Sequence, residues 1–191
     1  PYYYSTYEGG SAESGVDYVP GLSSSVKQKI AVVGSGPIRI GQGIEFDYGC
    51  VHAAGAIQDL GHEAIIINNN PETVSTDFDT SDRLYFDPLT LESVSEILLR
   101  EDANGILLQF GGQTAINLAL PLANEMPHLS TMGLELMMEG TSPESIDEAS
   151  DRERFEEFAL RCGLRMPDGA TATTPEGVRH AANEIGYPVL V

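Results

Sequence analysis

The sequence contains no tryptophan, only two cysteines, and only ten basic residues against 29 acidic ones in 191 positions. Its net charge of −19 repels phosphate groups, so binding to nucleic acid or to anionic membranes is not expected. No apolar run approaches the roughly 20 residues that a membrane-spanning helix needs. Cys50 and Cys162 lie far apart and lack the spacing of a metal site, which predicts a reducing, cytoplasmic location.

The acidic surplus has two interpretations. An acidic surface that is simply solvated, as in a salt-adapted host, needs no partner. An acidic face built for one basic partner would instead be a binding site. The first interpretation is the simpler one.

The first part of the chain differs in composition from the rest. Residues 8–25 are rich in glycine and serine and show no hydrophobic periodicity, so residues 1–26 are predicted to be a linker with the end of a preceding region. The segment from Pro1 to Tyr7 has neither the basic part nor the apolar part of a signal peptide. It also lacks an initiator methionine, and we therefore expect the chain to be a fragment.

From Lys29 onwards, short apolar runs alternate with amphipathic stretches. The apolar runs predict strands at 30–33, 64–67, 84–86, 106–110 and 134–138. The stretches between them predict helices at 44–60, at 91–100 with Thr90 as its cap, and from 111–114 to about 125. Strands without polar alternation, separated by helices, indicate a parallel sheet covered on both faces. Residues 27–140 are therefore predicted to be an α/β domain with a doubly wound parallel sheet.

The pattern changes after Gly140. Amphipathic helices are predicted at 151–162 and 175–185, with short strands at 170–174 and 188–191. Residues 141–191 are therefore predicted to be the incomplete start of a second domain.

The loop after the first predicted strand is rich in glycine, and it contains Gly34, Gly36, Gly41 and Gly43. A dinucleotide-binding fingerprint needs its third glycine three residues after the second, and an acidic residue about 20 positions later. Here Gly41 follows Gly36 by five residues, and the second strand ends in three asparagines. The spacing therefore argues against NAD and against a generic Rossmann-like nucleotide site.

Three polar or glycine-rich loops follow successive predicted strands, at 34–43, 70–77 and 111–114. The carboxyl ends of parallel strands open on one crevice, so these loops predict a functional face. Each loop taken alone also fits ordinary turns and helix caps.

Longer strings in this region resemble the large chain of carbamoyl phosphate synthetase. They are Gly36-Pro-Ile-Arg-Ile-Gly-Gln-Gly-Ile-Glu-Phe-Asp-Tyr48, Asn70-Pro-Glu-Thr-Val-Ser-Thr-Asp-Phe-Asp79, Ser81-Asp-Arg-Leu-Tyr-Phe86, Gly111-Gly-Gln-Thr114 and Asp151-Arg-Glu-Arg-Phe155. The resemblance covers about residues 27–191. The string from Pro71 to Asp77 is similar to the second of the family's two synthetase halves, which phosphorylates carbamate.

The resemblance implies that residues 27–140 precede an ATP-grasp fold and that residues 141–191 begin it. It implies ATP-dependent formation of carbamoyl phosphate from bicarbonate and glutamine-derived ammonia, for pyrimidine and arginine biosynthesis. The implied partners are the remainder of the large chain and a glutaminase small subunit. The implied cofactors are ATP and Mg or Mn, with metal ligands beyond Val191. The fragment itself is expected to be inactive and to contain no catalytic residue.

The resemblance also implies roles for four residues. Arg152 is expected to contact ATP, because an arginine can pair with phosphate oxygens in a bidentate way. Its alternative role is that of an exposed helix arginine paired with Glu156. Gly43, Glu45 and Glu72 are expected to line a tunnel that carries carbamate between the two sites. Their alternative roles are helix capping by Glu45 and a surface turn at Glu72.

A different class of function stays open beside the ligase. A truncated chain can be a non-catalytic binding or regulatory module of Rossmann-like fold. A sequence that continues into an ATP-grasp domain would favour the ligase.

Overall fold

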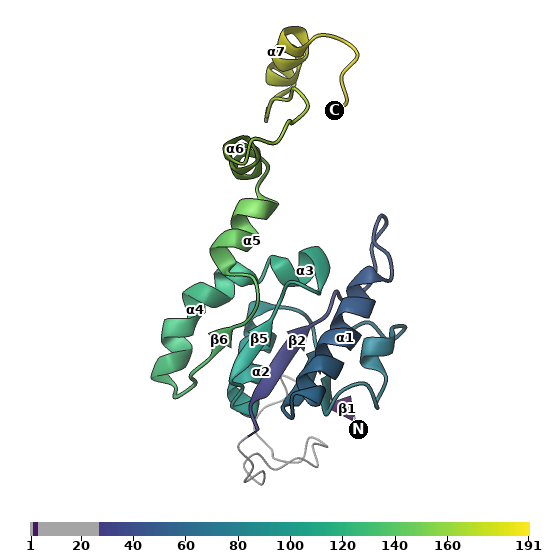
Figure 1. Cartoon of the computed structure of the whole chain (residues 1–191), viewed down its shortest axis with the longest axis vertical. Coiled ribbons are helices and arrows are strands. Elements are labelled where there is room, and N and C mark those ends of the chain that lie inside the picture. The colour runs from purple at the N-terminus through teal and green to yellow at the C-terminus, as the bar shows by residue number, and fades with distance from the viewer. Residues whose placement is uncertain (1, 4–26) are drawn as a thin grey trace. The chain divides into compact units, whose positions relative to one another are not determined.

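The computed structural model describes residues 2–3 and 27–191, and it contains a parallel sheet of six strands (Figure 1). The strands are β1 (Tyr2–Tyr3), β2 (Lys29–Val33), β3 (Glu63–Ile67), β4 (Arg83–Tyr85), β5 (Gly105–Leu107) and β6 (Met137–Met138). Their order is β1-β4-β3-β2-β5-β6, and every neighbouring pair is parallel. The predicted α/β fold with a parallel sheet is confirmed.

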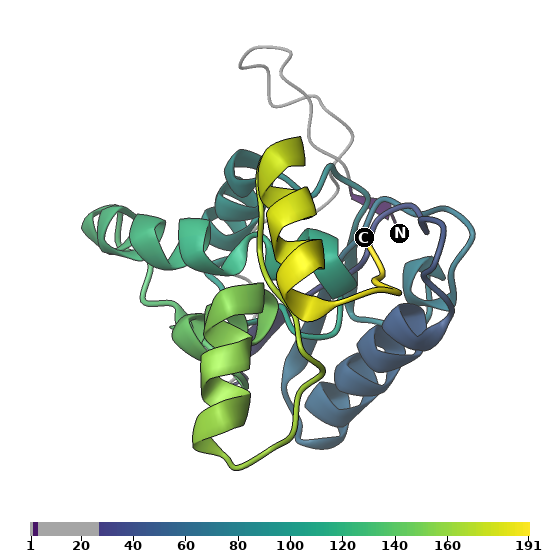
Figure 2. The same cartoon turned by 90° about the horizontal axis from the view of Figure 1, so that it is seen from above.

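Helices cover both faces of the sheet. They are α1 (Glu45–Asp59), the short 3₁₀ helix η1 (Val74–Thr76), α2 (Leu91–Glu101), α3 (Gly112–Ile116) and α4 (Ala119–Thr131). On one face, Ile66 packs with Cys50 and Ile57 of α1. On the other face, Ile65 and Ile67 pack with residues of α2 and α4. Figure 2 shows the same ribbon turned by 90°. Both sides of β3 are therefore buried, which explains why its sequence shows no polar alternation.

Two predicted elements differ in extent from those in the structure. The single helix expected from 111–114 to about 125 is two helices, α3 and α4, separated by a turn at Asn117–Leu118. The turn allows Leu118 and Leu122 to enter the core. The free energy gained by burying these side chains exceeds the cost of interrupting the helix. The strand expected at 134–138 is confined to Met137–Met138.

The chain divides into two units, one ending at Ile146 and one comprising Asp147–Val191. Helix α5 (Pro143–Ser150) was not predicted from the sequence. Ser142 caps its first turn by accepting a hydrogen bond from the Ser145 amide at 3.2 Å. Ser142 followed by Pro143 is a pattern typical of a helix start, because proline suits the first position of a helix.

The second unit contains α6 (Arg152–Arg161) and α7 (Pro175–Ile185), as predicted. The strands expected at 170–174 and 188–191 are wrong, because both segments are irregular in the structure. Within the described part of this unit there is no strand with which their amides could pair. The linker predicted at 8–25 lies outside the described residues. None of the helices described is long and apolar enough to cross a membrane.

Candidate functional site

The loops that follow β2, β3 and β5 meet at the carboxyl end of the sheet, as predicted. The amide of Gly34 donates a hydrogen bond to the carbonyl of Ile67 at 2.8 Å, which joins the first two loops. A Cβ at Gly111 would lie against the carbonyl oxygens of Val33 and Gly34, so only glycine permits the third loop to pass so close to β2. The three loops therefore form one continuous surface.

Asn68 holds the first two loops together from inside. It is 1% exposed and follows the last residue of β3. Its Oδ1 accepts a hydrogen bond from the Gly36 amide at 3.0 Å, and its Nδ2 donates to Ser75 Oγ at 3.0 Å. A buried amide with both ends satisfied fixes the relative position of the groups that it joins.

Asp47 makes a second connection between the same loops. It lies in the first turn of α1 and is 4% exposed. Its carboxylate accepts hydrogen bonds from the amides of Val74 at 2.9 Å and Ser75 at 3.0 Å. Asp47 therefore caps η1, which begins 27 residues further along the chain. No local sequence signal points to such a long-range contact.

A hollow of about 550 Å³ opens between these two loops. Its lining comes from the β2–α1 connection and from the β3–η1 connection: Pro37, Ile38, Gly43, Ile44, Asp47, Asn70, Pro71, Glu72, Thr73 and Val74. Open α/β sheets bind their ligands at this end, outside the carboxyl ends of the strands. We therefore take the hollow as the candidate site.

The structure brings three of the four predicted residues to this region. Gly43 and Glu72 both line the hollow. Glu45 does not line it, but its carboxylate accepts a hydrogen bond from the Gly43 amide at 3.2 Å. Glu45 is also the first residue of α1, where its negative charge complements the helix dipole, as its alternative role suggested.

Glu72 lies in a turn, as its alternative role suggested. Its amide donates a hydrogen bond to Asn70 Oδ1 at 3.0 Å, a geometry that is common in turns that begin with asparagine. The side chain is exposed at the rim of the hollow. Glu72 can hold both roles, because its backbone amide forms the turn while its carboxylate stands at the hollow.

Arg152 belongs to the second unit and is the first residue of α6. It is exposed, and no ion pair joins it to Glu156 in the described chain. The ion pairs of α6 are instead Arg154 with Asp147, and Arg161 with Glu148 at 2.5 Å. The guanidinium of Arg152 is therefore accessible to a ligand.

The hollow is acidic, and the thiol of Cys50 lies in the field of its Asp47. Asp47 and Glu72 are in its lining, and Glu45 is beside it. Burial, together with the charge of Asp47, raises the pKa of Cys50 to about 12, so the thiol stays protonated at neutral pH. Cys50 therefore serves as a core residue.

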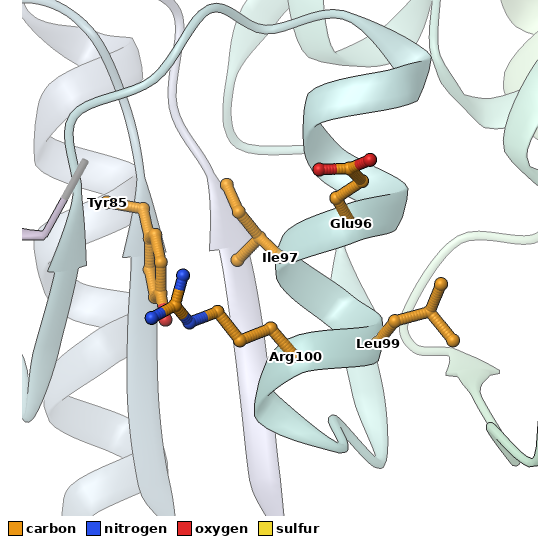
Figure 3. A pocket seen from close by; sticks show the side chains of 5 residues that line it. All are labelled: Tyr85, Glu96, Ile97, Leu99 and Arg100. Atoms are coloured by element: carbon orange, nitrogen blue, oxygen red, sulfur yellow. The ribbon is translucent and has the colours of Figure 1, made fainter. Parts of the chain in front are cut away.

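Another hollow, of about 280 Å³, lies between β4 and the outer side of α2 (Figure 3). Figure 3 shows Arg100 extending from α2 toward Tyr85, with Glu96, Ile97 and Leu99 on the same helix. Burial and a hydrogen bond to Glu101 raise the pKa of the Tyr85 hydroxyl. None of the three loops contributes to this hollow, and we do not assign it to the candidate site.

The described residues offer no metal site. Within residues 2–3 and 27–191, no group of three or more His, Cys, Asp or Glu side chains is placed to hold a metal ion. The hollow of the second unit, about 410 Å³ between α6 and α7, contains Glu153, His180 and Glu184 without such a grouping. The resemblance implied Mg or Mn ligands only beyond Val191, so the residues described here do not bear on that expectation.

Comparison with known sequences identifies relatives along the whole chain. The family described as carbamoyl phosphate synthase preATP-grasp domain matches residues 26–148. The large chain of carbamoyl phosphate synthase from Methanothrix thermoacetophila is 53% identical over 191 residues. The large chain from Methanosarcina acetivorans is 50% identical over the same length. The chain is covered completely in both comparisons and spans 17% of each relative.

Solved structures of low sequence identity share the fold. The biotin carboxylase domain of a single-chain bacterial carboxylase is 15% identical with a TM-score of 0.56, over 83% of this chain and 34% of that one. The N5-carboxyaminoimidazole ribonucleotide synthetase of Thermus thermophilus is 17% identical with a TM-score of 0.56, over 83% and 37%. The solved structures show the fold, and the sequence matches show that the chain belongs to the carbamoyl phosphate synthase large-chain family.

Proposed function

We propose that this chain is the beginning of the second synthetase half of a carbamoyl phosphate synthase large chain. The complete large chain forms carbamoyl phosphate from bicarbonate, ammonia and ATP, and this half transfers a phosphoryl group from ATP to carbamate. The assignment to the second half is supported by the string Asn70-Pro-Glu-Thr-Val-Ser-Thr-Asp77, whose first five residues line the hollow. The product serves pyrimidine and arginine biosynthesis in the cytoplasm.

The hollow between Gly43 and Glu72 is the observation that carries the proposal, and it is part of the passage for carbamate. Carbamate decomposes in water, so it must travel sheltered between the two active sites. Gly43 has no side chain and leaves the hollow open, while the carboxylate of Glu72 stands at its rim. Glu45 lies next to Gly43 and can contact the passage when its exposed side chain turns. Carboxylate oxygens in this position can accept hydrogen bonds from the N–H groups of carbamate or from neutral carbamic acid.

The nucleotide site lies mainly outside this chain. We assign residues 27–140 to the domain that precedes the ATP-grasp fold, residues 141–191 to the start of that fold, and residues 1–26 to the linker. The division of the chain after Ile146 and the family match ending at residue 148 lie close to this boundary. A fold relative, the biotin carboxylase domain of a 2-oxoglutarate carboxylase, is described in complex with MgADP. From the resemblance, we place the metal ligands of the enzyme beyond Val191 in the large chain.

The partners follow from the same proposal. The remainder of the large chain supplies the first synthetase half and the rest of the ATP-grasp domain. A glutaminase small subunit supplies ammonia. The exposed acidic residues need no basic partner in this arrangement.

The first prediction concerns activity. The full-length large chain should form carbamoyl phosphate from ATP, bicarbonate and free ammonia, whereas residues 1–191 alone should not. Phosphoryl transfer needs both a metal ion and a complete nucleotide cleft. The proposal places the metal ligands and most of that cleft beyond Val191. Phosphorus NMR of the two reaction mixtures measures the product directly. Product formation by the isolated chain, or none by the full-length chain, would contradict the proposal.

The second prediction concerns Arg152. In the full-length enzyme, Arg152→Ala should raise the apparent KM for ATP in the carbamate-phosphorylating half by about tenfold or more, because a charge-assisted contact with phosphate is lost. Arg165→Ala is the control, since it removes another exposed arginine from the same unit. ATP formation from ADP and carbamoyl phosphate, the reverse of carbamate phosphorylation, isolates this half, and its apparent KM for ADP should rise by a similar factor because the same phosphate contact is lost. If Arg152→Ala and Arg165→Ala have the same apparent KM for the nucleotide, Arg152 has no role in nucleotide binding.

A further inference from the structure

The two walls of the hollow come from segments that are separate in sequence. Gly43 lies in the connection from β2 to α1, and Glu72 lies in the connection from β3 to η1. Both connections are largely exposed, and Ile44 and Val74 at the edges of the hollow are 74% and 51% exposed. Hydrophobic packing alone therefore does not fix the distance between the walls.

Asp47 spans this gap. It is anchored in α1, four residues after Gly43, and its carboxylate accepts hydrogen bonds from the amides of Val74 and Ser75, two and three residues after Glu72. The N-cap residue of η1, Thr73, makes no side-chain cap of its own. The cap of η1 is thus supplied from the opposite wall, by a side chain that is 4% exposed and also lines the hollow.

The link between the two walls consists of two hydrogen bonds to the buried carboxylate of Asp47. Two hydrogen bonds to one buried carboxylate are charge-assisted and resist competition from water better than neutral ones. Asn68 independently secures Ser75 and Gly36 near the strand ends. Asp47 is the link that lies in the wall of the hollow itself, and its loss should allow the Glu72 side to move away from the Gly43 side.

We propose that Asp47 is a positioning residue that sets the width of the carbamate passage. This inference rests on the proposed function, and it assigns to Asp47 a role in retaining the intermediate rather than in either chemical step. A widened passage leaks carbamate, which takes up a proton and breaks its C–N bond to give carbon dioxide and ammonia. The ATP already used to make that carbamate is then lost.

The test is the Asp47→Asn variant of the full-length large chain, supplied with ATP, bicarbonate and ammonia. Asparagine keeps the size of the side chain but offers one acceptor oxygen and turns a donor toward the second amide. The ATP consumed for each carbamoyl phosphate formed should rise about threefold or more, because the intermediate escapes. Hydrogen exchange at the amides of Val74 and Ser75 should accelerate by about tenfold. Asp59→Asn, an exposed aspartate at the other end of α1, should change neither quantity.

A second variant, Val74→Pro, keeps the inference testable if Asp47→Asn misfolds. Val74→Pro removes one of the two donating amides, and proline is well tolerated at the first position of a helix. Thr73 before it is already extended, with φ −127° and ψ 151°, as a residue preceding proline must be. This variant should raise the ATP cost per product in the same direction as Asp47→Asn.

The outcomes separate the inference from the proposed function. Unchanged ATP consumption per product in both variants, with a productive parent enzyme, would overturn the role of Asp47 and leave the proposed function standing. A slower enzyme with an unchanged ratio would mean a structural role only, which also overturns the inference. A parent enzyme that forms no carbamoyl phosphate would refute the proposed function and the inference together.

Discussion

Replacing Glu101 by glutamine is expected to lower the free energy of unfolding of this chain by about 3–5 kcal/mol, the usual effect of breaking a buried ion pair. Glu101 is the last residue of α2 and is fully buried. Its carboxylate pairs with the guanidinium of Arg83, accepts a hydrogen bond from Tyr85 at 2.5 Å and lies 3.6 Å from Lys29 Nζ. Glutamine keeps the shape of the side chain but removes the charge that balances two nearly buried cations.

The position of this cluster explains the large effect. Lys29 and Arg83 begin two strands of the sheet, and Glu101 ends the helix that packs on one face of that sheet. Arg83 also pairs with Glu63 at 3.2 Å, so the cluster joins β2, β3, β4 and α2. Removing one member leaves the others desolvated and incompletely paired.

Urea unfolding of the 191-residue chain, followed by circular dichroism, measures the loss. Glu96→Gln is the matched control, because Glu96 lies on the same helix and is exposed. The control should shift the free energy of unfolding by no more than about 0.5 kcal/mol. If both variants unfold at the same urea concentration, the cluster contributes nothing to stability.

The sheet could be predicted from sequence because its signals are local. The runs at 30–33 and 64–67 are continuously apolar, and in the structure β2 and β3 are buried on both faces. Thr90 marked the start of α2, and it accepts a hydrogen bond from the Ser93 amide at 3.3 Å. The position of the three loops on one side of the sheet then followed from the rule that the carboxyl ends of parallel strands meet at the same edge.

The remaining features depend on contacts between distant parts of the chain. Asp47 reaches across 27 residues, and Glu101 pairs with Lys29 across 72. In the sequence, Glu101 resembles any acidic residue near the end of an amphipathic helix, and nothing local marks it as buried. The strands expected at 170–174 and 188–191 failed for the same reason, because a short apolar segment becomes a strand only beside a partner.

Replacing Gly43 by phenylalanine is expected to abolish carbamoyl phosphate synthesis in the full-length enzyme, by about a hundredfold or more, while both halves keep their own chemistry. The substitution adds a large side chain at a residue that lines the hollow. The fold should tolerate it, because the backbone of Gly43 does not have a positive φ. The group that a new Cβ would meet is the carboxylate of Glu45, the exposed end of a flexible side chain that can turn aside.

Gly55→Phe is the matched control for this variant. Gly55 lies in α1, and a Cβ there has no neighbour within 4 Å, so the same change of side chain fills open space. This control should keep both the synthesis and the partial reactions of the parent enzyme. It separates the effect of plugging the hollow from the general effect of an added aromatic residue.

Three rates measured in the Gly43→Phe enzyme decide whether the hollow is a carbamate passage. They are bicarbonate-dependent ATP hydrolysis, ATP formation from ADP and carbamoyl phosphate, and overall carbamoyl phosphate synthesis from ammonia. A blocked passage predicts that the first two rates stay within about twofold of the parent enzyme while the third is lost. Synthesis at the parental rate, or loss of all three rates together, would contradict the assignment of the hollow beside Gly43 and Glu72 to the carbamate passage.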